Sequence, residues 1–166
     1  MAGRVTSPEL FAALREPDEG DLDPVFSPLT DPRFALGLET IYEGYLVHYG
    51  RPRAYEPADG DAALVLGDYL YAQGLARIAS LGDVDAVSDL SELISLCAHV
   101  QADGRAGDGA AWAATAALLG RARLVDARAA LSRNGNPGPL ELLARETAGD
   151  EVVDLALEAH ARQMDR

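Results

Sequence analysis

The chain has 166 residues, 48% of them hydrophobic, which is enough to bury the core of one ordinary domain without metals or disulfides. Its basic residues are 14 arginines with no lysine, set against 27 acidic residues. The resulting net charge of −13 disfavours nucleic acid and anionic lipid as partners. A single cysteine, Cys97, excludes an internal disulfide framework. We expect a cytoplasmic protein that is not integral to a membrane.

The N-terminal part, 1–30, is predicted to be a short helix followed by an acidic connector. Ser7 and Pro8 suit the cap and first turn of a helix that continues to about Arg15. The residues from 16 to 30 carry three prolines and several acidic side chains, so they are expected to cross the surface as a solvated linker. No basic head followed by an apolar run, the signature of a signal peptide, occurs here.

The remainder, 31–166, is predicted to be a helical bundle. Apolar residues recur at helical spacing almost throughout, and the alternation typical of strands is hard to find, so the predicted fold class is all-α. Caps, glycines and prolines mark the ends of the elements. The expected helices are Asp31 to His48, Asp61 to Leu81, Val84 to Ala102, Ala110 to Arg133, and Leu140 to Met164, the last either continuous or broken at Gly149.

Two features inside these helices predict tight packing. Gly67 and Gly74 each cost a helix about 1 kcal/mol relative to alanine, so a neighbouring helix is expected to approach closely there. Cys97 lies on the same apolar face as Leu90 and Ile94, which favours an inert buried thiol over a nucleophile.

A set of spaced residues between Glu39 and Leu70 carries a resemblance to a known family. Gly50 and Pro52 form a G-x-P segment, and fifteen residues after Pro52 stands a G-D-x-L segment made by Gly67, Asp68, Tyr69 and Leu70. This spacing resembles the first half of the trans-polyprenyl diphosphate synthases, which are all-helical. The fold that the resemblance implies is a helical bundle like the first half of the isoprenoid synthase fold.

On the same frame the charged motifs of the family are replaced. The D-D-x-x-D motif falls on Glu39, Thr40 and Glu43, and the arginine pair that clamps the diphosphate falls on His48 and Tyr49. A weaker match to the K-T-A-x-L segment keeps Thr115 and replaces the lysine with Ala114. In the family these aspartates hold the Mg²⁺ ions that bind the allylic diphosphate.

These replacements favour a structural over a metal-binding interpretation. Glu39 and Glu43 lie one helical turn apart, but Thr40 removes the central carboxylate, so a pair of solvated or bundle-facing glutamates is preferred. Arg51 and Arg53 are candidate anion contacts, with surface ion pairs as the alternative. No residue is predicted to be catalytic and no metal site is predicted.

For the remaining acidic, histidine and aromatic residues we also prefer a structural role over a functional one. Asp85, Asp89 and Glu92 are expected to form an exposed acidic stripe rather than a metal site. The acidic run from Asp150 to Asp154 is expected to be a helix N-terminus rather than a second aspartate motif. The dispersed histidines are predicted to be structural, and aromatic residues that could line a prenyl tunnel are more simply core: His48, His99, His160, Tyr42, Tyr45, Tyr69, Tyr71 and Trp112.

The resemblance implies a function without chemistry of its own. It is that of the small non-catalytic subunit of a heteromeric long-chain synthase, which pairs with a catalytic subunit and sets its activity or product length. The chain would then need no cofactor, and Mg²⁺ would be held by the catalytic partner. The alternative is a helical interaction or scaffold domain with no isoprenoid role. A third possibility, a homodimeric synthase that uses Glu39 and Glu43, requires Mg²⁺-dependent turnover by the chain alone.

Overall fold

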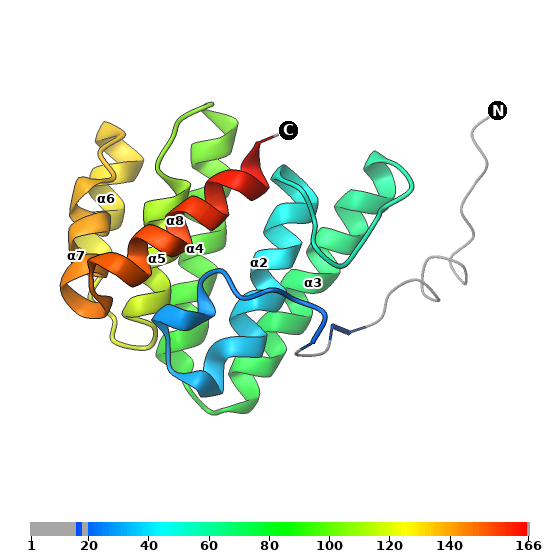
Figure 1. Ribbon diagram of the computed structural model, residues 1–166, viewed down its shortest axis with the longest axis horizontal. Helices are drawn as coiled ribbons and strands as arrows, with labels where there is room; N and C mark the ends of the chain where they lie inside the picture. Colours follow the sequence, from blue (N-terminus) through cyan, green and yellow to red (C-terminus); the bar gives the residue numbers. More distant parts are fainter. Residues whose placement is uncertain (1–15, 18–19, 166) are drawn as a thin grey trace.

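The computed structural model describes residues 16–17 and 20–165, and these form seven α-helices and no strand, which confirms the all-α class. None of these helices combines the length and the apolar character needed to cross a bilayer. The helix predicted from Ser7 to Arg15 lies outside the described residues. The helices are α2 (Ala35–Tyr49), α3 (Gly60–Ser80), α4 (Val84–Ala102), α5 (Asp108–Ala117), α6 (Val125–Asn134), α7 (Gly138–Ala148) and α8 (Asp150–Met164) (Figure 1).

Helices α2 and α3 pack side by side through glycines, as the cost of Gly67 and Gly74 predicted. A Cβ atom on Gly74 would lie 2.3 Å from Cγ1 of Ile41 and 2.8 Å from the carbonyl oxygen of Gly37. A Cβ on Gly67 would lie 2.4 Å from Nε2 of His48. The close approach of the two helix backbones therefore depends on glycine, which has no side chain, at these contacts.

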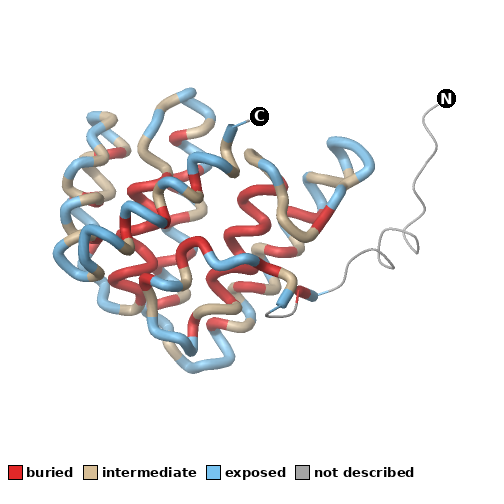
Figure 2. The backbone as a smooth tube through the Cα atoms, in the orientation of Figure 1, coloured by how far each residue is buried: buried red, intermediate tan, exposed pale blue. Residues whose placement is uncertain are grey.

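The core is centred on α2 and α5. Figure 2 shows both helices buried along most of their length, with the other helices exposing one side. The aromatic members of this core pack edge to face or tilted, with ring centroids 5.0 Å apart for Tyr42 and Trp112 and 5.5 Å apart for Tyr45 and Trp112. Cys97 is buried in the same core, as predicted, and burial raises the pKa of its thiol well above the usual value.

Residues 22–29 cross the surface as predicted, but the prediction that they form a solvated linker is wrong. Leu22, Val25, Phe26 and Leu29 are buried in this segment, which crosses the front of the molecule in Figure 2. The ring of Phe26 lies 5.6 Å from that of Trp112. We call residues 20–30 the strap. The sequence of the strap resembles that of a linker because it carries prolines and acidic residues. Its few apolar side chains follow neither the helical nor the strand period, so they gave no signal of burial.

The predicted helix from Ala110 to Arg133 is also wrong, because α5 ends at Ala117 and α6 begins at Val125. Gly120 and Ala122, at φ values of +77° and +50°, turn the chain through left-handed backbone between them. Such a conformation costs a non-glycine residue about 1–3 kcal/mol, so it persists only where other contacts hold it. The expected break at Gly149 is confirmed, with φ at +94° between α7 and α8.

Gly74→Ala tests the close packing of α2 on α3. Overpacking against Ile41 is expected to outweigh the gain in helix propensity and to lower the free energy of unfolding by about 1–2 kcal/mol, measured by urea denaturation. Gly60→Ala is the control, because nothing lies within 4 Å of the Cβ it would add. A Gly74→Ala protein as stable as the parent would show that the two helices are not held this close.

Candidate functional site

The side chains of Glu39 and Glu43 point into the protein. Both lie on α2 beneath the strap, and Oε1 of Glu39 accepts three successive backbone N–H groups of the strap, from Val25, Phe26 and Ser27, at 2.9, 2.9 and 2.7 Å. Consecutive N–H groups that converge in this way form an anion-binding nest. In this protein the nest is occupied by the carboxylate of Glu39, a group of the chain itself, instead of an external anion.

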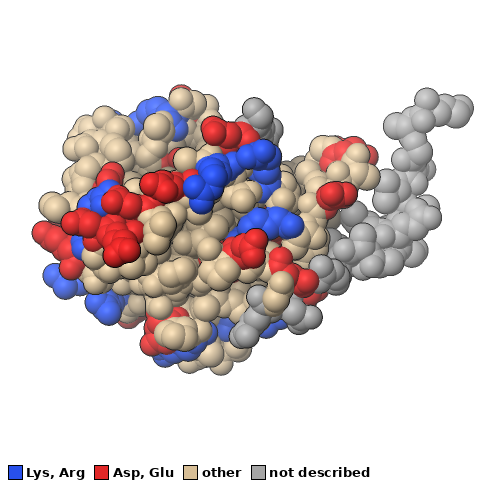
Figure 3. Space-filling model, viewed as in Figure 1, with Lys and Arg blue, Asp and Glu red and all other residues tan. Residues whose placement is uncertain are grey.

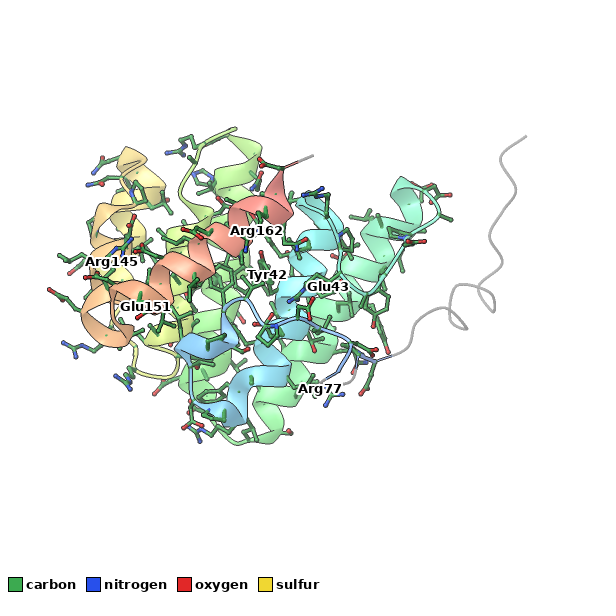
Figure 4. All side chains as sticks on the ribbon, in the orientation of Figure 1. Tyr42, Glu43, Arg77, Arg145, Glu151 and Arg162 are labelled. Carbon is green, nitrogen blue, oxygen red and sulfur yellow. The ribbon has the colours of Figure 1, made fainter. Side chains whose placement is uncertain are left out.

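The second glutamate holds the loop that follows α2. Oε1 of Glu43 accepts the backbone N–H groups of Arg53 and Ala54 at 2.7 and 2.8 Å. Its side chain is completely buried. Figure 4 shows Glu43 beside Tyr42 on α2, behind the strap. Glu43 thus fixes the position of residues 53 and 54 in the same manner as Glu39 fixes the strap.

Arg53 neutralises part of this buried charge. Its Nη1 lies 2.8 Å from Oε2 of Glu39 and its Nε lies 2.9 Å from Oε2 of Glu43, with only 6% of the side chain exposed. The same guanidinium donates to the carbonyl oxygens of Glu39 and Asp23 and lies over the ring of Tyr42. Burial alone would lower the pKa of Arg53, but the two glutamates raise it above its usual value.

The carboxylate oxygens of the cluster are occupied by hydrogen bonds from within the chain. Each carboxylate oxygen of Glu39 and Glu43 already accepts at least one hydrogen bond, and the hydroxyl of Thr40 donates to the carbonyl of Leu36 at 2.7 Å. Among the described residues no group of three or more potential ligands could hold a metal ion. Arg53, a candidate anion contact from the sequence, pairs here with the carboxylates of Glu39 and Glu43, which enclose its guanidinium.

The other family-matching residues have structural roles near the cluster. Gly50 caps α2 by donating its N–H to the carbonyl of Leu46 at 2.8 Å. Arg51 is exposed and donates to the carbonyl of Arg162 at the end of α8, which Figure 4 places near the loop. Asp68 contacts His48, with 3.2 Å between Oδ1 and Nε2. Pro52 is half-buried, and Leu70 and Thr115 are fully buried.

A second buried polar network joins α2, α5 and α8, and its members come from positions that no sequence spacing connects. Oη of Tyr42 lies 2.9 Å from Nδ1 of His160, and Nε2 of His160 lies 2.9 Å from Oδ2 of Asp108. Tyr45 donates to the same Asp108 oxygen at 2.6 Å, and Gln101 donates to Tyr45 at 2.7 Å. Both ring nitrogens of His160 therefore have a buried partner, Tyr42 on one side and Asp108 on the other.

The electrostatics of this network support a structural role. Burial raises the pKa of Asp108, but hydrogen bonds from His160 and Tyr45 outweigh it and leave that pKa below its usual value. Burial also raises the pKa values of Tyr42 and Tyr45, so both keep their protons. An Asp–His–Tyr relay is able in principle to activate a nucleophile, but the fully buried Phe26 lies against His160 with 5.6 Å between the rings. The aromatic core is closed at the strap.

The acidic stripe expected on α4 is only partly exposed. Asp89 is buried, so the expectation of an exposed stripe is wrong for it, whereas Asp85 and Glu92 are exposed as expected. The carboxylate of Asp89 accepts the N–H of Gly120 at 2.9 Å, and Nη2 of Arg128 donates to the Asp89 carbonyl at 3.0 Å. No local signal indicated this burial, because both partners lie more than thirty residues away.

The acidic run from Asp150 is the first turn of α8, as expected. Arg145 on α7 lies 2.7 Å from Asp154 and 3.4 Å from Asp150, and it also contacts Glu141 at 2.8 Å. Figure 3 shows acidic side chains gathered around this part of the surface. Exposed pairs of this kind contribute little to stability.

Comparisons with known proteins add no relative. No protein-family model, curated protein or solved structure matches the chain. The two carboxylates and the guanidinium of the cluster bind each other and two backbone segments, so every carboxylate oxygen already accepts a hydrogen bond from within the chain.

Glu43→Gln tests whether the cluster holds the fold. The substitution keeps the shape of the side chain but removes a charge that faces Arg53, and breaking a buried ion pair typically costs about 3–5 kcal/mol. We expect the free energy of unfolding in urea to fall by about 3 kcal/mol. Glu56→Gln, at an exposed position in the following loop, is the control and should change it by less than about 0.5 kcal/mol. Equal stability of the two variants would contradict the structural role of the cluster.

Asp108 predicts a specific dependence of stability on pH. Because its pKa is lowered in the folded protein, its contribution to stability is present above the unfolded carboxyl pKa of about 3.9 and is lost as pH falls through the folded value. Urea denaturation of the parent from pH 6 to pH 3 should therefore show a fall that is shallower in Asp108→Asn. Parallel curves for the two proteins would show that Asp108 has an ordinary pKa.

Proposed function

We propose that this chain is a non-catalytic subunit that pairs with a catalytic trans-polyprenyl diphosphate synthase and modulates its activity or product length. The observation that carries the proposal is the complete internal engagement of Glu39 and Glu43. These two residues stand where the resembled family has the carboxylates that bind Mg²⁺, and here they hold the strap and the loop after α2.

The loss extends to the groups that would bind a diphosphate. Prenyl transfer needs Mg²⁺ to neutralise the departing pyrophosphate and cationic side chains to clamp it. At the family's arginine positions His48 packs against Gly67 and Tyr49 against Tyr45, and at the lysine position Ala114 is fully buried. A chain with this frame and without these groups acts through contact with another polypeptide, and Mg²⁺ and substrate are held by that partner.

The choice of partner rests on the resemblance between residues 39 and 70 and the synthase family. We place the complex in the cytoplasm, where a lone thiol such as Cys97 stays reduced. One observation favours the alternative of a helical scaffold with no isoprenoid role. Tyr42, Tyr45 and Trp112, the candidates for lining a prenyl tunnel, are fully buried against one another.

A mixing experiment tests the proposal. The purified chain alone should turn over no allylic diphosphate in the presence of isopentenyl diphosphate and Mg²⁺. Added to the trans-polyprenyl synthase encoded in the same genome, it should raise the rate at least several-fold or shift the product length, and the two should elute together in gel filtration. Unchanged rate and product with no co-elution would reject the proposal and favour the scaffold. Turnover by the chain alone would contradict its non-catalytic role.

A further inference from the structure

A small pocket of about 340 Å³ lies where α2 begins and α3 ends, and none of the charged residues of the buried cluster lines it. Its lining comes from both helices and from the 3₁₀ turn Pro32–Phe34 that precedes α2. Ile78 in the lining is buried, Leu36 is half-buried, and Leu81 is 43% exposed. Val84, on the other side of the turn between α3 and α4, is 79% exposed. Two large apolar side chains therefore face solvent at this end of the described structure.

The described chain begins beside this pocket. Nη2 of Arg77, a lining residue, lies 2.7 Å from Oε2 of Glu16, the first residue that the structure describes. The next residue, Pro17, is buried. Figure 4 labels Arg77, which locates this contact on the molecule. The residues that precede Glu16 are therefore joined covalently to a point next to the pocket.

Those preceding residues carry one group of apolar side chains at helical spacing. Leu10, Phe11 and Leu14 stand at i, i+1 and i+4, which places them on one face of the helix predicted for residues 7–15. Ala12 falls on the opposite face. A helix this short is only marginally stable in water on its own, and it forms where its apolar face is buried against another surface.

The short connection to Glu16 determines which surface this apolar face can reach. Leu14 precedes Glu16 by two residues, at most about 7 Å of chain. Leu10 precedes it by six residues, about 9 Å along a helix. Joining two surfaces through so short a link gives an effective concentration in the millimolar range, so the chain's own segment has an advantage over a separate molecule at the pocket.

We propose that residues 7–15 dock as an amphipathic helix over the pocket between the start of α2 and the end of α3. Leu10, Phe11 and Leu14 form the face that covers Leu81. The occupant follows from the contact between Glu16 and Arg77, which holds the segment next to apolar surface that no described residue covers. This inference does not depend on the proposed function.

Thiol reactivity tests the docking in the full chain. Cys97 is completely buried and its pKa is raised, so a cysteine introduced at the surface is the thiol that reacts with N-ethylmaleimide. Leu81→Cys should react slowly, and adding Leu14→Asp should raise its rate at least several-fold, because a charged residue on the apolar face opposes docking. Ala12→Asp adds the same charge on the opposite face and should leave the rate unchanged.

Ala79→Cys is the matched control for the reporting thiol. Ala79 is exposed on α3, two residues after Arg77, but it does not line the pocket, so its cysteine should react at one rate with or without Leu14→Asp. If Leu14→Asp leaves the rate of Leu81→Cys unchanged, or raises both rates equally, the inference is overturned. Protection of Leu81→Cys that grows with protein concentration would also overturn it, because the cover would then be a second copy of the chain.

Discussion

The Glu39–Arg53–Glu43 cluster places two negative charges and one positive charge where each side chain is at most 6% exposed. Removing such groups from water costs several kcal/mol per ion, and the cost is recovered only when nearly every lone pair and proton finds a partner. Here the guanidinium and five backbone N–H groups supply those partners. The excess negative charge is balanced by backbone dipoles, so the cluster forms only when the strap and the loop after α2 are both in place.

Helix α2 is central to the fold, because each of its sides packs against a different element. One side of it lacks side chains at Gly37 and Gly44 and lies directly on α3. On another side Glu39 and Glu43 face the strap. On a third side Tyr42 contacts His160 and Tyr45 contacts Asp108. A helix so enclosed has little freedom to shift, because a displacement along its axis breaks glycine contacts and buried hydrogen bonds together.

Sequence patterns predicted the features that depend on near neighbours. The helix period located α2, α3 and α4, and the cost of glycine inside a helix predicted the contact at Gly67 and Gly74. The patterns failed where partners are distant in sequence. The burial of the strap does not follow from local sequence because the hydrogen bonds that hold it come from Glu39 on another element. The burial of Asp89 does not either, because Gly120 and Arg128 belong to a later part of the chain. The spacing of Glu39 and Glu43 predicted that they share one face of a helix, but it did not predict that Arg53 would form ion pairs with both.

The acidic residues of the fold are of two kinds, those that bind other groups of the chain and those that face solvent. On α2 the acidic side chains bind the chain itself, and their removal would leave Arg53 buried without a counter-ion, so these positions are constrained by folding. On α4 and α6 only Asp89 is used in this way, and it fixes the spacing of the two helices while their remaining acidic residues face solvent. Exposed charges cost little to keep and contribute little to stability, but they select and orient partners. The exposed acidic residues of α4 and α6 are therefore free of the folding constraint that holds Glu39 and Glu43 on α2.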